Sequence, residues 1–116
     1  PLLQVKAVDA NPLVDLLPTV PGARIVLLNA LRTVPSPVLP KIVGAGEVYA
    51  EIASLEGVGG IANILQRMLV ERLLFGSHAP LFYIESALLK LDESPLTEEQ
   101  LRAICNENAA RLLKWD

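Results

Sequence analysis

The chain has 116 residues, of which 52% are hydrophobic and only 4% aromatic, and its net charge is −3. This length favours a single domain, and the aliphatic excess, with a mean hydropathy of +0.42, favours buried parallel strands over an open antiparallel sheet. The scattered lysines and arginines of an acidic chain argue against nucleic-acid binding, and prolines and charges interrupt every apolar run before the roughly 20 residues of a membrane span. Cys105 is the single cysteine, which excludes an internal disulfide and fits a reducing, cytoplasmic location; we expect it to be a small core residue.

Segments with the character of strands and of helices alternate about four times along the chain, which is the pattern of a parallel sheet built from βαβ units. The first predicted strand spans residues 2–8. Asn11 precedes a proline and can cap a short helix that follows it. The second predicted strand spans residues 23–29, where consecutive apolar residues lead to the polar Asn29 at the strand tip.

The third predicted strand, residues 47–55, alternates between two faces and carries Glu51 on one of them. A short helix is expected before it, for which Ser36 is the natural cap. Glu51 has two readings: it points into an interior pocket, or it pairs with Lys6 or Arg24 across the sheet. The structural pair is the preferred reading, because ionic side chains inside a small α/β core need a partner.

A glycine-rich turn, residues 57–60, follows this strand and leads into an amphipathic helix over residues 61–70. Backbone N–H groups of such a loop can cradle a phosphate at a helix start. The spacing matches no nucleotide-binding fingerprint, however, and Glu56 next to the loop would repel an anion. We therefore predict a plain strand-to-helix turn.

The last predicted strand, residues 73–75, is apolar without alternation, as expected of a parallel strand covered on both faces. It stops at Gly76, Ser77 and His78, which is the only histidine of the chain. Pro80 then bars continuation of the strand and can open a helix at its first turn. Strand tips of this kind are where α/β proteins place their chemistry.

Two helices are predicted at the carboxyl end of the chain. The first buries Ile84, Leu88 and Leu91. The second begins at Thr97, which has the spacing of a capping box with Gln100, and it carries Asn108 on its buried stripe. A polar side chain at that position needs a hydrogen-bond partner, which we expect to be a backbone group of a neighbouring loop.

The run from Glu71 to Leu113, with LLFGSHAP followed by a helix and then ICNENAARLL, resembles the carboxyl end of the amidohydrolase-2 type of metal-dependent hydrolases. Members of that family are (β/α)8 barrels whose last strand commonly reads FGSD-x-P or FGTD-x-P. More loosely, VYAEIAS resembles the seventh strand, ARIVLLNA the sixth and LLQVKAV the fifth. The resemblance implies that residues 1–116 form one segment, the carboxyl-terminal half of a TIM-like barrel with about four strands, since whole barrels take about 250 residues.

The resemblance also implies a metal site, from which this chain departs. The family holds its metal with an H-x-H pair of the first strand, histidines of the fifth and sixth strands, and the aspartate of the eighth. Here Asn29 stands at the sixth-strand histidine and His78 at the eighth-strand aspartate, and the H-x-H pair is absent. Because zinc sites take three or four ligands, we expect a divalent metal such as zinc only in a completed protein, and none in this chain alone.

We thus expect a hydrolase or decarboxylase of small molecules, whose active site lies at the carboxyl ends of the strands and is completed by an amino-terminal half of the barrel. His78 is the candidate catalytic base or metal ligand, and Asn29, Glu51 and Ser77 are candidate substrate-binding residues. His78 also has a structural reading, as a group that fills a polar pocket. Two alternatives for the whole chain stay open: a non-catalytic, metal-free relative, and a half-barrel that completes itself by pairing with a second copy.

Overall fold

A parallel sheet organises the chain in the computed structural model, which describes residues 8–34 and 37–114. Its three strands lie in the order β1 (Arg24–Leu27), β2 (Glu47–Glu51), β3 (Leu73–Leu74). Leu27 lies opposite Ala50, and Glu51 lies opposite Leu74, so the carboxyl ends of the strands meet at one edge of the sheet. The predicted α/β class and parallel sheet are confirmed.

The described residues contain three strands rather than the predicted four or so. The predicted first strand, residues 2–8, lies outside the described residues except for its last position, as does the Ser36 cap. The strand predicted over residues 47–55 ends at Glu51, because the Glu51 carboxylate captures the Ala53 N–H and turns the chain away from the ladder.

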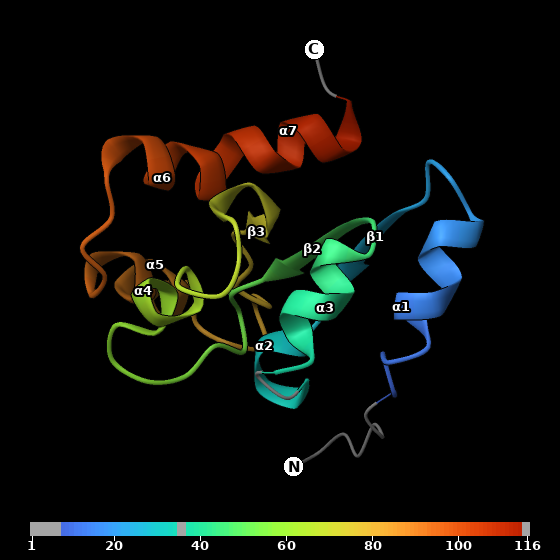
Figure 1. Cartoon of the computed structure of the whole chain (residues 1–116). Helices are drawn as coiled ribbons and strands as arrows, with labels where there is room; N and C mark the ends of the chain where they lie inside the picture. Colours follow the sequence, from blue (N-terminus) through green and yellow to red (C-terminus); the bar gives the residue numbers. More distant parts are fainter. Residues whose placement is uncertain (1–7, 35–36, 115–116) are drawn as a thin grey trace.

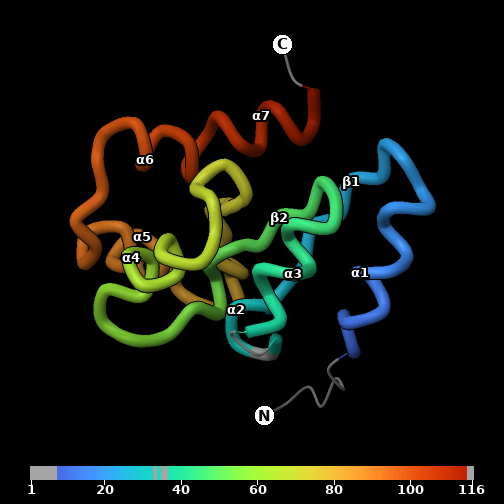
Figure 2. The backbone as a smooth tube through the Cα atoms, viewed as in Figure 1, coloured from blue at the N-terminus to red at the C-terminus, as the bar shows by residue number. Residues whose placement is uncertain are grey.

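Short helices connect and cover the strands (Figure 1). Their bounds are α1 (Leu13–Leu16) with the 3₁₀ helix η1 (Leu17–Thr19), α2 (Ala30–Thr33), α3 (Leu39–Gly44), α4 (Gly60–Ile64), the 3₁₀ helix η2 (Val70–Arg72), α5 (Ile84–Asp92), α6 (Glu98–Arg102), the π-helical turn η3 (Ala103–Glu107) and α7 (Asn108–Leu113). Among the helices of residues 8–34 and 37–114, none has the length and apolarity needed to cross a bilayer. Figure 2 traces the chain from α3 into β2 and onward through α4.

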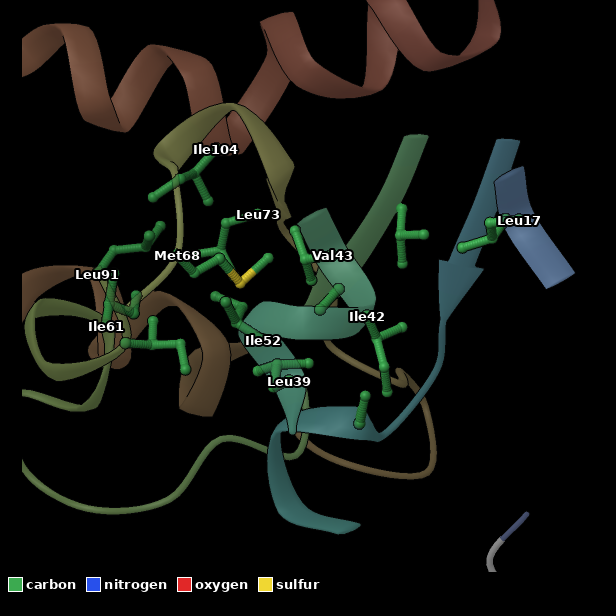
Figure 3. Packing of buried hydrophobic residues seen from close by; sticks show 14 residues of the cluster. Leu17, Leu39, Ile42, Val43, Ile52, Ile61, Met68, Leu73, Leu91 and Ile104 are labelled. Carbon is green, nitrogen blue, oxygen red and sulfur yellow. The ribbon is translucent and has the colours of Figure 1, made fainter. Parts of the chain in front are cut away.

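The hydrophobic core lies on one face of β2. The side chains of Val48, Ala50 and Ile52 alternate onto this face and belong to one buried cluster with residues of α3 and α4. Figure 3 shows Leu39, Ile42 and Val43 of α3 within this cluster, with Ile61 of α4 beyond them. Tyr49 and Glu51 alternate onto the opposite face and are also buried, so β2 is covered on both sides.

The rod formed by α6, η3 and α7 lies against β3, where the Phe75 N–H donates to the Ile104 carbonyl. The predicted capping box is confirmed, because Thr97 and Gln100 exchange both side-chain to backbone hydrogen bonds. The predicted partner of Asn108 is confirmed as well: its fully buried amide donates to the carbonyls of Val70 and Leu73, at 2.6 and 2.7 Å.

Four predictions about helices are wrong. The helix expected over residues 61–70 ends at Ile64, and the helix expected to open at Pro80 begins at Ile84, after a turn in which the Phe82 N–H donates to the His78 carbonyl. Ile84 and Leu88 are exposed rather than buried, because α5 meets the core with Ala87 and Leu91, so only Leu91 of the predicted three is buried. Cys105 is exposed rather than a core residue, since its helix buries Ile104 instead.

Candidate functional site

Glu51 is the centre of the candidate site, at the carboxyl end of β2. Its side chain is only 7% exposed, and each carboxylate oxygen accepts a backbone hydrogen bond. Oε1 accepts from the Asn29 N–H at 2.8 Å, and Oε2 accepts from the Ala53 N–H at 2.6 Å. Charge-assisted bonds of this length fix the carboxylate in one orientation, which is how a site preorganises a charged group.

Asn29 takes part through its backbone. The residue follows β1 and has φ +61°, a left-handed conformation that asparagine tolerates better than most residues. This conformation directs the Asn29 N–H at Glu51, while the Asn29 side chain is exposed. The Asn29 backbone thus lies beside Glu51, and the expected contact of Asn29 with substrate stays a prediction.

Gly76 lies directly against the Glu51 carboxylate. A Cβ atom placed on Gly76 would come within 2.5 Å of Glu51 Oε2 and 3.2 Å of Glu51 Cβ. Only glycine leaves room for the carboxylate at this point, so the glycine that ends the last strand is part of the site. The sequence marks this position only as the end of an apolar run, and the close approach is visible only in three dimensions.

His78 faces the same carboxylate from the loop after β3. Its Nε2 lies 3.5 Å from Glu51 Oε1, and the side chain is 27% exposed. Nε2 itself is buried and has no hydrogen-bond partner among the described residues. The ring packs edge-on against Phe82, with centroids 5.8 Å apart, and φ of +53° turns the residue toward the site. Glu51 and His78, two candidate residues that the sequence does not pair with each other, thus face one another in the structure.

Two further site expectations are changed by the structure. The preferred pairing of Glu51 with Arg24 is wrong, because Arg24 lies opposite Glu47 at the other end of the sheet and donates to the Leu112 carbonyl. Lys6, the other suggested partner, lies outside the described residues. Ser77 is half-buried, and its hydroxyl accepts a hydrogen bond from the Ala79 N–H at 3.2 Å, which shapes the loop that carries His78.

Lys90 is a site residue that the sequence reasoning missed. From α5 its ammonium donates to the carbonyls of Ile52 and Ala53, at 3.0 and 2.7 Å, and so holds the segment that supplies a hydrogen bond to Glu51. Desolvation lowers the pKa of Lys90, and the nearby charges of Glu51 and Glu56 partly offset this effect. The signal in the sequence is a lone lysine among leucines 88, 89 and 91 of a predicted helix.

A groove of about 440 Å³ opens beside this site, between α5 and the loop that follows β2. The loop contains the glycine-rich segment 57–60, where the Gly60 N–H donates to the Gly57 carbonyl as in the predicted strand-to-helix turn.

The described residues do not form a complete metal site. No group of three or more histidine, cysteine, aspartate or glutamate side chains lies together in residues 8–34 and 37–114. Glu51 and His78 are two candidate ligands, whereas zinc takes three or four. Zinc therefore stays a prediction for a protein in which other residues supply the missing ligands.

Comparison with protein-family models, with curated proteins and with solved structures finds no match to this chain. The class that can be stated is an α/β protein with a parallel sheet and a carboxylate–imidazole pair at the carboxyl edge of that sheet.

Proposed function

We propose that this chain is the carboxyl-terminal half of an amidohydrolase-type barrel that hydrolyses or decarboxylates small molecules, with Glu51 and His78 as its proton-transfer pair. One observation carries the proposal: a buried, doubly hydrogen-bonded carboxylate lies 3.5 Å from a histidine nitrogen, at the carboxyl ends of two adjacent parallel strands. This is the edge at which barrel enzymes place their active sites. The motif LLFGSHAP adds the family resemblance.

The geometry assigns different roles to the two ring nitrogens of His78. Nε2 is buried and faces Glu51, so in the neutral imidazole it carries the proton and turns it toward the carboxylate. Nδ1 is then the basic nitrogen, which can take a proton from a water molecule attacking a substrate carbonyl. Glu51 orients the ring and stabilises the imidazolium that forms, as the carboxylate of a catalytic triad does. When substrate binds, His78 Nε2 and Glu51 Oε1 move from 3.5 Å apart to hydrogen-bond distance, which completes the proton-transfer pair.

A zinc ion, if ligands from the missing half hold it, would supply an activated water or polarise the substrate carbonyl. The proton transfer from water to His78, with Glu51 orienting the ring, uses only side chains of this chain. The substrate class is a small molecule that fits beside the pair, and the remaining walls of its pocket are proposed to come from the other half of the barrel.

A second copy of the chain is the other candidate for the missing half. Register places Val26 of β1 on the same face as Tyr49 and Glu51, and Val26 is partly exposed there. Leu28, at the end of the same strand, is 67% exposed. In a closed barrel this face is the packed interior. Tyr49 and Glu51 are already buried on it, so the exposure of Val26 and Leu28 favours a partner that covers the β1 side of this face.

The test begins with native mass spectrometry of the protein purified together with the polypeptides that bind it, which shows the partner and any added metal. The same material is then assayed on a panel of p-nitrophenyl esters and anilides. We expect hydrolysis that is reduced at least a hundredfold by His78→Asn and by Glu51→Gln, the usual range for loss of a general base. Glu98→Gln, an exposed carboxylate of α6, is the matched control. Full activity of correctly folded His78→Asn protein would refute the proposal.

A further inference from the structure

The groove beside Glu51 has features of a ligand site in its own right. Its volume of about 440 Å³ lies within the range of about 300–1,000 Å³ found for small-molecule sites. Its walls are the loop after β2 and one stripe of α5 with the residues at either end of that helix, and Arg32 of α2 adds to the lining. The lining includes Ser54, Leu55, Phe82, Leu89, Lys90 and Glu93.

Two residues that line this groove, Ser54 and Lys90, carry hydrogen-bond donors without a full set of partners. Ser54 is only 9% exposed, and its hydroxyl has no hydrogen-bond partner among the described residues. A buried, unsatisfied hydroxyl costs free energy unless a ligand satisfies it. Lys90 uses two of its three N–H donors on the carbonyls of Ile52 and Ala53, which leaves one N–H for another acceptor. Both groups suit a carboxylate.

The charge at the other end of the groove has the opposite sign. Glu93 lies one turn beyond Lys90 along the same stripe of the helix, and it forms no ion pair within residues 8–34 and 37–114. The remaining two charges of the lining, Arg32 and Glu56, offset each other as a pair at 3.8 Å. The groove is therefore lined by two cations and two carboxylates. Of these, Lys90, which also feels the charges of Glu51 and Glu56, and Glu93 form no ion pair within the part of the chain that the structure describes.

We propose that this groove binds a free amino acid with an apolar side chain. The ligand carboxylate contacts the Lys90 ammonium and the Ser54 hydroxyl, and the ligand ammonium contacts Glu93. The ligand side chain packs on Leu55, Phe82 and Leu89, which supply the apolar part of the lining. A ligand with only a negative charge would pair with Lys90 alone, and a ligand with only a positive charge would pair with Glu93 alone. The inference concerns binding, and it stands whether or not Glu51 and His78 are catalytic.

The experiment measures binding of L-leucine by isothermal calorimetry and by backbone amide NMR shifts, with isocaproate and isoamylamine as probes that lack the ammonium and the carboxylate. We expect L-leucine to bind at least about tenfold more tightly than either analogue, the size of one charged hydrogen bond. Shifts should be concentrated in residues 53–58 and 86–93.

Two variants and a control sharpen this test. Glu93→Gln should weaken leucine binding about tenfold, and Asp92→Asn, an equal charge change outside the groove, should leave it unchanged. Ser54→Ala should weaken binding about threefold while leaving the protein as stable as before or more so, because it removes an unsatisfied hydroxyl. Absence of leucine binding, equal affinity for isocaproate, or insensitivity to Glu93→Gln would each overturn the inference, whatever the activity of the Glu51 and His78 variants.

Discussion

Replacement of Gly76 by alanine tests the packing of the site most sharply. The new methyl group would lie 2.5 Å from Glu51 Oε2 and 3.2 Å from Glu51 Cβ. The carboxylate cannot simply swing away, because the Asn29 and Ala53 N–H groups hold both of its oxygens. Relief of the clash therefore breaks a charge-assisted hydrogen bond worth about 1.5–3 kcal/mol or strains the backbone by about 1–3 kcal/mol. We expect Gly76→Ala to lower the free energy of unfolding by about 1–3 kcal/mol.

The assay is urea unfolding followed by circular dichroism, with Gly44→Ala as the matched control. A Cβ on Gly44 meets no atom within 4 Å, and the residue lies in α3, so alanine there should be neutral or stabilising by up to about 1 kcal/mol. In a Glu51→Ala background the cost of Gly76→Ala should largely disappear, because the clashing group is gone. A loss below about 0.5 kcal/mol in the wild-type background, or an undiminished loss in the Glu51→Ala background, would show that the reasoning is wrong.

Three further predictions concern the framework around the site. Asn108→Ala removes a buried amide that serves two carbonyls and should cost about 2–4 kcal/mol in urea unfolding, whereas Asn106→Ala on the exposed side of the same rod should cost less than about 0.5 kcal/mol. Thr97→Ala removes the capping box and should lower the free energy of unfolding by about 1 kcal/mol, whereas Thr97→Ser should keep most of that stability. Equal stability of the wild-type protein and both variants would contradict the capping role. Burial lowers the pKa of Lys90 in the folded state below its usual 10.5, so between that lowered pKa and 10.5 the unfolded chain binds more protons than the folded chain. The free energy of unfolding of the wild-type protein should therefore rise with pH in this range relative to that of Lys90→Met. A difference in unfolding free energy between the two proteins that stays constant with pH would contradict the burial of the ammonium.

The sequence predicts the framework of the site well, for identifiable physical reasons. Asn29 and His78 follow the ends of apolar runs, and parallel strands bring their carboxyl ends to one edge. Glu51 lies at the same edge, although the sequence places it in the middle of the strand predicted over residues 47–55. The burial of Asn108 follows from helical periodicity, and its need for a partner follows from the cost of burying an amide. These inferences depend on local pattern alone.

Other features depend on contacts between segments far apart in the chain. Gly76 belongs to the site only because the Glu51 carboxylate approaches it, and Lys90 only because α5 crosses the end of β2. The sequence predicts that the strand of β2 continues to residue 55, whereas it ends at Glu51. The strand is ended by the Glu51 side chain, which accepts the Ala53 N–H, and not by a glycine or proline that the sequence would show. Arg24 was considered as a partner for Glu51, but four residues of strand, about 13 Å, separate their backbone levels.

The central claim is that Glu51 orients His78 as a base, and nitrogen-15 NMR of the imidazole tests it directly, because the chain contains one histidine and its signals are unambiguous. At a pH where the ring is neutral, we predict the tautomer with its proton on Nε2, and a marked loss of this preference in Glu51→Ala, where the facing carboxylate is gone. A proton on Nδ1, or a tautomer unaffected by Glu51→Ala, would contradict the account.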